Sequence, residues 1–295
     1  MGRNLTGSLG HRSRKVYRLR IKGGELEVGK RTLVMGVLNV TPDSFSDGGL
    51  YFDPRAAVQR AFEMVQEGAD IIDIGGESTR PGSDPLPLEE ELRRVLPVIE
   101  AIAPRIGIPI SIDTYKAKVA EEALSAGASI VNDISGLGFD PEMARVVARH
   151  GACAILMHIK GTPKDMQKDP RYDDVMGEIK AYLRERIRRA ESAGVSPDAI
   201  VIDPGIGFGK RLEHNIEIFR RLEELEELEK PILVGPSRKT FIGEILGVDV
   251  SQRLYGTLAA VAHAVLRGAH IVRVHDVGAA RQVVDMLDAL EGFGG

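Results

Sequence analysis

Leu33-Val34-Met35-Gly36-Val37-Leu38-Asn39 is an almost unbroken apolar run that ends in a polar residue, and residues 54–67 after it have the period of a helix. A second apolar run, residues 70–75, follows that helix. Strands this apolar need both faces buried, as in a parallel sheet that helices cover. The segment therefore predicts a unit of strand, helix and parallel strand.

The same unit recurs to the end of the chain. Eight strands are expected, at residues 33–39, 70–75, 109–113, 129–133, 152–158, 199–203, 232–235 and 270–275. The helices expected between them include residues 54–67, 116–126, 175–193 and 252–266. Glycine stands just before five strands, where a helix has to stop and the chain has to turn with positive φ: Gly68, Gly127, Gly151, Gly194 and Gly268.

Eight such units in about 265 residues fit an α/β fold of one closed (β/α)8 TIM barrel. A doubly wound open sheet is the alternative. Residues 17–32, with Gly23-Gly24 between alternating residues, predict a β-hairpin that plugs the floor of the barrel. Residues 1–16 are expected to form a tail, disordered or resembling a transit peptide, and residues 17–295 to form one barrel domain.

The composition favours a small-molecule enzyme. The 295 residues are 43% hydrophobic and 28% charged with a net charge of −4, so no basic face predicts nucleic acid as a partner. The single cysteine, Cys153, excludes a disulfide framework and a thiolate-rich metal site. No run approaches the roughly 20 apolar residues of a membrane span, so the expected location is cytoplasmic, without membrane attachment.

Polar residues follow nearly every predicted strand, on the barrel face where chemistry is found in this fold. A single Asp or Asn at such a place is often only a helix cap or turn former. The ensemble is more informative, because these strand ends converge on one mouth. Asp113, Asn132 and Asp203 offer acceptors and an amide for a flat heterocycle rich in donors. Cationic donors for a phosphate-like anion come from Arg80, Lys239, Arg273 and His275.

Three other patterns are not read as ligand motifs. The run Gly205-Ile206-Gly207-Phe208-Gly209-Lys210 has neither dinucleotide nor P-loop spacing, and its glycines are interpreted as allowing close approach to a flat ligand. No His or Cys spacing suits zinc. Residues 213–229, with Leu222, Leu225 and Leu228 three apart, are expected to form one amphipathic helix.

With these residues in view, the chain resembles the dihydropteroate synthases. The resemblance spans Val34 to Val277 and rests on four motifs in family order: residues 35–49 (MGVLNVTPDSFSDGG), 73–82 (DIGGESTRPG), 203–210 (DPGIGFGK) and 235–239 (GPSRK). It implies that residues 17–295 are a pterin-binding barrel. It also implies condensation of 6-hydroxymethyl-7,8-dihydropterin diphosphate with p-aminobenzoate, which are then the small-molecule partners, and assembly as a homodimer.

The resemblance also assigns roles by position. The pterin would be held by Asp113, Asn132, Met157, Asp203, Phe208 and Lys239. The diphosphate would meet Asn39, Thr79, Arg80, Arg273 and His275, with Asn39 also meeting Mg²⁺. The p-aminobenzoate would meet Phe45, Pro81 and Thr240, the last standing where the family commonly has serine. The residues expected to act in catalysis are Asp47, Arg80 and Lys239.

Diphosphate leaves readily once its charge is spread, and the methylene cation left behind is conjugated with the dihydropterin. A dissociative, SN1-like path is therefore expected, with Asp47 stabilising the cation. Two alternatives remain open. One is a pterin-dependent methyltransferase with a corrinoid partner, which would have no use for Ser237-Arg238-Lys239; the other is a noncatalytic pterin-binding protein.

Overall fold

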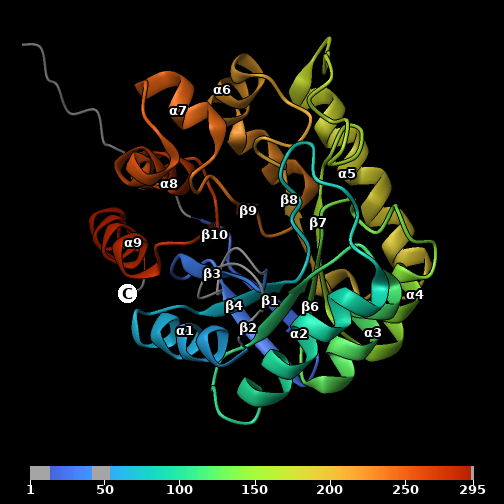
Figure 1. Ribbon diagram of the computed structural model, residues 1–295. Helices are drawn as coiled ribbons and strands as arrows, with labels where there is room; N and C mark the ends of the chain where they lie inside the picture. Colours follow the sequence, from blue (N-terminus) through green and yellow to red (C-terminus); the bar gives the residue numbers. More distant parts are fainter. Residues whose placement is uncertain (1–13, 42–53, 294–295) are drawn as a thin grey trace, which may run out of the picture.

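Eight parallel strands form the centre of the structure, and helices surround them (Figure 1). This computed structural model describes residues 14–41 and 54–293. The strands are β3 (Leu33–Asn39), β4 (Ile71–Gly75), β5 (Ile110–Asp113), β6 (Ile130–Asp133), β7 (Cys153–Met157), β8 (Ile200–Asp203), β9 (Leu233–Val234) and β10 (Ile271–Val274). The α-helices are α1 (Pro54–Gln66), α2 (Leu88–Ile102), α3 (Ala117–Ala126), α4 (Met143–His150), α5 (Val175–Ser192), α6 (Leu212–Arg220), α7 (Thr240–Leu246), α8 (Leu254–Leu266) and α9 (Val277–Glu291).

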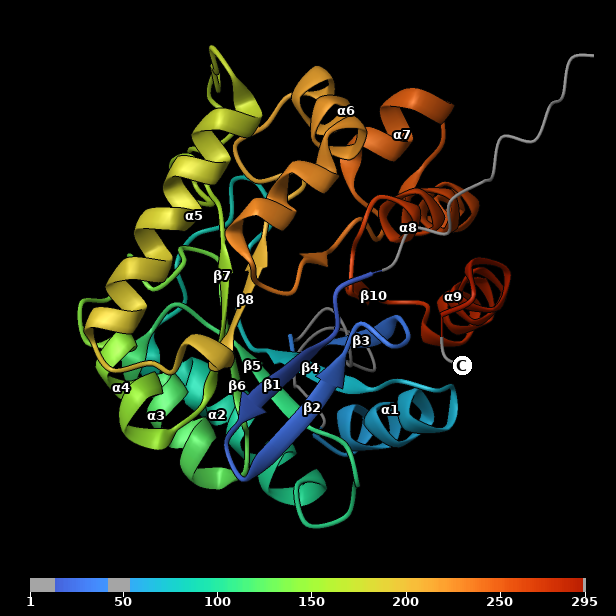
Figure 2. The ribbon, with the colours of Figure 1, turned by 180° about the vertical axis from the view of Figure 1, so that it is seen from behind.

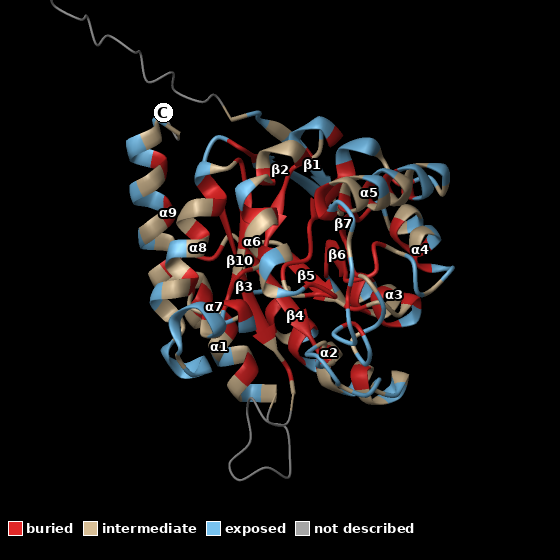
Figure 3. Cartoon of the chain, turned by 90° about the horizontal axis from the view of Figure 1, so that it is seen from above, coloured by how far each residue is buried: buried red, intermediate tan, exposed pale blue. Residues whose placement is uncertain are grey.

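The sheet closes on itself. Its order is β8-β7-β6-β5-β4-β3-β10-β9, and the two end strands meet where the Ile202 amide donates to the Pro231 carbonyl at 3.0 Å. Each strand is connected to the next by a segment that contains at least one helix, and Figure 3 shows buried strands inside a ring of helices with exposed outer faces. The predicted (β/α)8 barrel is confirmed.

The floor of the barrel is closed by the predicted N-terminal hairpin. Strands β1 (Tyr17–Ile21) and β2 (Gly24–Val28) pair antiparallel and lie across the barrel end in Figure 2. Leu19 and Val28 are buried in one apolar cluster with residues at the beginnings of the barrel strands, including Leu33 and Ile71. Burial of these apolar side chains stabilises the hairpin on the barrel.

Packing against the barrel includes Arg14, a little before the hairpin. The Arg14 guanidinium donates to the Gly29 carbonyl (2.9 Å) and to the Thr32 hydroxyl (2.8 Å), and its Nη2 lies 3.7 Å from Asp288 of α9. The Arg14 side chain is almost fully buried, and its contact with Asp288 links the segment before the hairpin to α9.

The expectation of one helix over residues 213–229 is wrong. Helix α6 ends at Arg220, and a 3₁₀ helix, η2 (Leu222–Leu228), follows. Leu222, Leu225 and Leu228 are all buried, because a spacing of three residues puts side chains on one line only when there are three residues per turn. The other 3₁₀ helices are η1 (Pro197–Ala199) and η3 (Val250–Gln252). Among the described residues, no helix is long and apolar enough to cross a membrane.

Candidate active site at the mouth of the barrel

A hydrogen-bonded network joins four strands at the barrel mouth. Arg273 of β10 donates from Nε to Asp73 Oδ2 and from Nη2 to Asp113 Oδ2, both at 2.6 Å. Asn132 of β6 donates from Nδ2 to the same oxygen of Asp73 at 3.0 Å. Asp73 is in β4 and Asp113 ends β5. The barrel therefore brings together three predicted site residues, Arg273, Asp113 and Asn132. Asp73, to which the sequence analysis gave no role, contacts two of them directly.

Burial and neighbouring charge set the ionisation of this network. Burial raises the pKa of Asp113 to about 7, although Arg273 partly offsets the effect, and Asp73 adds to it. Burial also opposes the charge of Arg273, but Asp73 and Asp113 outweigh it and raise the Arg273 pKa. Arg273 therefore stays cationic, while Asp113 exchanges a proton near neutral pH.

Asp203, at the end of β8, is held by its own loop. Its Oδ1 accepts the Gly205 amide hydrogen at 2.7 Å, and 5% of the residue is exposed. Burial raises the Asp203 pKa to about 6, while the Gly205 amide and then Lys239 act in the opposite direction. Of the two carboxylate oxygens of Asp203, Oδ1 is occupied by the Gly205 N–H and Oδ2 has no partner among the described residues.

Lys239 stands over an aromatic ring at the mouth. Its Nζ lies 4.0 Å from the centre of the Phe208 ring, which is within the range of a cation–π contact. Burial lowers the Lys239 pKa to about 8, with Arg273 acting the same way and Asp203 and Asp113 opposing. Phe208 and Met157 belong to a buried apolar cluster that lines this side of the mouth, with Ile134, Ile159 and Met166.

A second polar group lies where β3, β9 and β10 end. His275 Nδ1 is 2.9 Å from the Ser237 hydroxyl, which also accepts the His275 backbone N–H at 3.2 Å. The Asn39 amide nitrogen is 3.5 Å from His275 Nε2, the outer limit of a hydrogen bond. Burial, followed by the charge of Arg273, lowers the His275 pKa to about 3, so this imidazole is neutral at pH 7.

The loop between β4 and α2 reaches the loop that follows β7 (Figure 1). The Gly82 N–H donates to the Pro163 carbonyl at 2.9 Å, and Lys164 pairs with Asp84 at 2.8 Å. This loop carries three of the predicted site residues, Thr79, Arg80 and Pro81. Arg80 is exposed, and its guanidinium pairs with no carboxylate of the described residues.

The glycines after β8 have a packing role that was not expected from the sequence. A Cβ on Gly205 would lie 2.0 Å from the His158 carbonyl oxygen, and one on Gly209 would lie 2.3 Å from the Lys160 carbonyl oxygen. These two glycines therefore let the loop pack against the backbone that follows β7. Gly205 and Gly207 also border residues of the mouth, because a Cβ on Gly205 would lie 3.2 Å from Met157 Cγ and one on Gly207 would lie 3.3 Å from Lys239 Cδ.

The three remaining predicted residues are Thr240, Phe45 and Asp47. Thr240 is exposed at the first position of α7, directly after Lys239. Phe45 and Asp47 lie outside the described residues.

The sequence analysis missed two buried charged residues. Asp73 interrupts the apolar run Ile71-Ile72-Asp73-Ile74, and that interruption was the available signal. Lys210 carried no such signal, because it only ends the glycine-rich run. It is buried, donates to the Phe208 carbonyl at 2.9 Å and lies 2.9 Å from His158 Nδ1, so it fixes the loop that carries Phe208.

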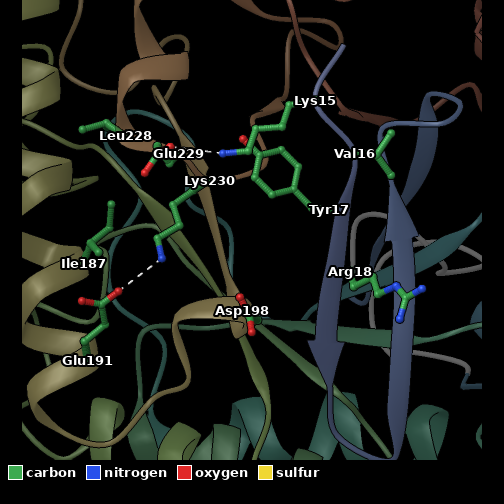
Figure 4. Close-up of a pocket in the computed structure, with 10 residues that line it drawn as sticks. All are labelled: Lys15, Val16, Tyr17, Arg18, Ile187, Glu191, Asp198, Leu228, Glu229 and Lys230. Atoms are coloured by element: carbon green, nitrogen blue, oxygen red, sulfur yellow. Dashed lines mark hydrogen bonds and ion pairs between the residues drawn. The ribbon is translucent and has the colours of Figure 1, made fainter. Parts of the chain in front are cut away.

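A separate pocket of about 550 Å³ lies at the opposite end of the barrel, beside the hairpin (Figure 4). Four of its charged side chains form two pairs, Lys230 with Glu191 at 3.2 Å and Lys15 with Glu229 at 3.3 Å. None of the predicted site residues lines it. The mouth is therefore the candidate site.

Known proteins match this chain over nearly its whole length. The sequence profile of the family described as "Pterin binding enzyme" matches residues 35–275. The dihydropteroate synthase of Synechocystis sp. is 52% identical over 263 residues, which are 89% of this chain and 91% of that protein.

Solved structures agree with the sequence matches. The Yersinia pestis dihydropteroate synthase, solved with a sulfonamide drug, has a TM-score of 0.88 and 44% identity, and the alignment covers 93% of this chain and 99% of that one. The Xanthomonas albilineans dihydropteroate synthase, solved with 4-aminobenzoic acid, has a TM-score of 0.87 and 44% identity, with 93% and 98% covered. The resemblance found in the sequence is thus confirmed, and the chain belongs to the dihydropteroate synthase family of pterin-binding enzymes.

Proposed function

We propose that this chain joins 6-hydroxymethyl-7,8-dihydropterin diphosphate to p-aminobenzoate, forming 7,8-dihydropteroate and releasing diphosphate in folate biosynthesis. The observation that carries the proposal is the set of oriented acceptors at the mouth, Asp113, Asn132 and Asp203, beside the cations Lys239 and Arg273. Family membership supports the same reaction.

The acceptors suit the pterin. An aminopyrimidine edge offers N–H donors, which a carboxylate or an amide oxygen accepts. Asp203 keeps Oδ2 for such a donor because Gly205 occupies Oδ1. Phe208 and Met157 supply an apolar surface for the flat ring, and Lys239 orients it from the edge.

Changing Asp203 to Asn should weaken pterin binding by about ten- to a hundredfold. The Gly205 N–H requires an acceptor, so the new amide would turn its oxygen to Gly205 and its NH₂ to the ligand. A donor would then face a donor, which calorimetry with a pterin would detect. Asp203→Glu keeps the acceptor chemistry and controls for charge. Equal pterin affinity in Asp203→Asn would contradict the assignment.

The diphosphate is assigned to the other side of the mouth, with Asn39, His275, Arg273 and the loop residues Thr79 and Arg80. Arg273 uses Nε and Nη2 on carboxylates, so Nη1 is the nitrogen left for a phosphate oxygen. His275 is neutral, and donation from the Ser237 hydroxyl to Nδ1 would place its proton on Nε2. The Asn39 amide nitrogen, 3.5 Å away, cannot accept that proton, which leaves it for the leaving group.

Mg²⁺ fits this side of the mouth as a partner of the substrate. Asn39 offers an amide oxygen, a ligand type that Mg²⁺ accepts, and magnesium is commonly held by one or two protein groups together with substrate phosphates. Consistent with sharing, no group of three or more His, Cys, Asp or Glu side chains that could hold a metal occurs in the described part of the chain. When bound, the ion would neutralise charge on the departing diphosphate.

The carbon–oxygen bond is proposed to break first. The bonding electrons leave with the diphosphate, and the methylene carbon becomes part of a cation delocalised over the dihydropterin. The amine of p-aminobenzoate then attacks this carbon and gives up a proton to the released diphosphate. Asp47 is assigned to stabilise the cation, with Arg80 closing over the site. Phe45, Pro81 and Thr240 are assigned to p-aminobenzoate. The complex of the Xanthomonas albilineans relative with 4-aminobenzoic acid supports that substrate.

The decisive assay incubates the protein with pterin diphosphate, p-aminobenzoate and Mg²⁺. Dihydropteroate and diphosphate are expected in equal amounts. Methyl transfer to a corrinoid protein would indicate the methyltransferase instead, and tight pterin binding without turnover would indicate the noncatalytic alternative.

Assembly as a homodimer is part of the proposal. Four exposed apolar side chains lie on the consecutive elements α7, η3 and α8: Ile245, Leu246, Val250 and Tyr255, the last 81% exposed. Such clustering is typical of a protein interface. Sedimentation velocity should give a dimer for the wild type and for Tyr255→Phe, and a monomer for Tyr255→Asp combined with Leu246→Asp. Unchanged dimers in the double variant would rule out this surface. The cytoplasmic location expected from the sequence stays a prediction.

A further inference from the structure

Asp73 is a buried carboxylate at the centre of the mouth network. It is 0% exposed, on a strand whose other residues are apolar, and one of its two oxygens does all its bonding. Oδ2 accepts from both Arg273 and Asn132, whereas Oδ1 is buried with no partner among the described residues. A carboxyl group this buried is costly unless it is paired, and the groups that pair with Asp73 are Arg273 and Asn132.

The contact with Asp73 fixes the orientation of the Asn132 amide. An amide offers a donor on one side and an acceptor on the other, and the two ends are otherwise interchangeable in shape. The bonded oxygen of Asp73 acts as an acceptor here, so the NH₂ of Asn132 has to face it at 3.0 Å. The amide oxygen of Asn132 is then the atom left for a ligand, and it has no partner among the described residues.

The same oxygen of Asp73 holds Arg273 by its Nε at 2.6 Å. Arg273 in turn reaches Asp113, another residue proposed to bind the pterin. Asp73 Oδ2 therefore sets the orientation of the Asn132 amide on β6. It also sets the position of Arg273, which holds Asp113 on β5.

We infer that Asp73 is a positioning residue for pterin recognition: it turns the Asn132 amide so that its oxygen faces the ring, and it holds Arg273 against Asp113. Asp73 does not itself touch the substrate. The inference rests on the proposed function and deepens it. It explains how Asn132 presents an acceptor, beside Asp113 and Asp203, to the donor-rich edge of the ring, and so favours aminopyrimidines over rings that offer acceptors at this edge.

The orientation is measurable without substrate. The chain has four asparagines, Asn4, Asn39, Asn132 and Asn215, so selective ¹⁵N-asparagine labelling gives four side-chain NH₂ signals. The signal that disappears in Asn132→Asp identifies Asn132. In the free wild-type protein this NH₂ should exchange slowly with solvent, because the residue is 5% exposed and its NH₂ donates to a carboxylate.

Asp73→Ala removes the acceptor and should speed this exchange and weaken pterin binding by about ten- to a hundredfold. Asp73→Asn retains an oxygen in the same place and should lose clearly less affinity than Asp73→Ala. Ser111→Ala is the matched control, because Ser111 is the register partner of Asp73 on β5 and its buried hydroxyl has no partner among the described residues. The control should leave both signals unchanged. Slow exchange and full pterin affinity in a folded Asp73→Ala protein would overturn the inference.

A double-mutant cycle keeps the test sharp if Asp73→Ala fails to fold. Asn132→Asp keeps an acceptor toward the ring but sets two carboxylates against each other. Adding Asp73→Asn removes one of those charges, so the double variant should bind pterin at least about tenfold more tightly than Asn132→Asp alone. Losses that simply add would contradict the inference. If the wild type makes no dihydropteroate but the Asn132 exchange depends on Asp73 as stated, the proposed function fails and the positioning role stands.

Discussion

Replacing Arg273 by methionine is expected to lower the free energy of unfolding by about 3–5 kcal/mol and to slow dihydropteroate formation by about 10²–10³-fold. The physical reason is that Arg273 is the only cation of the described residues that is hydrogen-bonded to both Asp73 and Asp113. Methionine fills a similar volume but leaves Asp73 and Asp113 without the cation that donates hydrogen bonds to both of them. The rate falls because Arg273 Nη1, the nitrogen proposed to meet the diphosphate, is lost.

Chemical unfolding followed by circular dichroism measures the first effect, and single-turnover kinetics at a temperature where the variant is folded measures the second. Arg273→Lys is the matched control. It retains the charge, but an ammonium cannot present two nitrogens in a planar fork, so stability should lie between wild type and Arg273→Met. A methionine variant as stable as the wild type would show that the carboxyl groups are neutral in the folded protein and that the ion pairs do not stabilise it.

The fold could be predicted from the sequence because strands and helices are encoded locally, by apolar runs and by helical periodicity. The predicted strand at residues 33–39 has the same bounds as β3. A continuous apolar run of this length is stable as a strand of a parallel sheet that helices cover on both faces. The break of residues 213–229 into α6 and η2 was legible in part. The spacing of Leu222, Leu225 and Leu228 pointed to three residues per turn, but the acidic residues between them imitate the polar face of an α-helix.

The site was predictable only as a set of strand ends. That Asp113, Asn132 and Arg273 meet follows from barrel closure, but the partner that joins them does not. Asp73 and Arg273 are 200 residues apart, and their contact depends on the strand register, which fixes the height of each side chain in the barrel. The docking of Gly82 on Pro163 joins two loops, whose paths no periodic pattern encodes.

His275→Ala should slow kcat by about 10²–10³-fold, the usual cost of removing one donor aimed at charge that develops in the transition state. Neutral His275 is fixed through Ser237 and lies beside Asn39, so its loss withdraws a donor from the departing diphosphate without altering the pterin contacts of Asp203 or Asn132. Pterin affinity should stay within about threefold, because the interaction strengthens only as the bond breaks. His275→Asn keeps a side-chain N–H and should recover part of the rate.

The slowed variant also decides the order of bond breaking. In His275→Ala, carbon–oxygen cleavage becomes rate-limiting, so deuterium on the reacting methylene reports directly on that carbon. If cleavage precedes attack by the amine, the carbon becomes planar in the transition state and the secondary isotope effect on kcat/KM is clearly normal. If the amine attacks as the diphosphate leaves, the carbon stays crowded and the effect lies near unity. The first result is expected, because the low basicity of an arylamine favours attack on a cation already formed, and the carboxyl groups of Asp113 and Asp203 lie at the mouth where they would stabilise that cation.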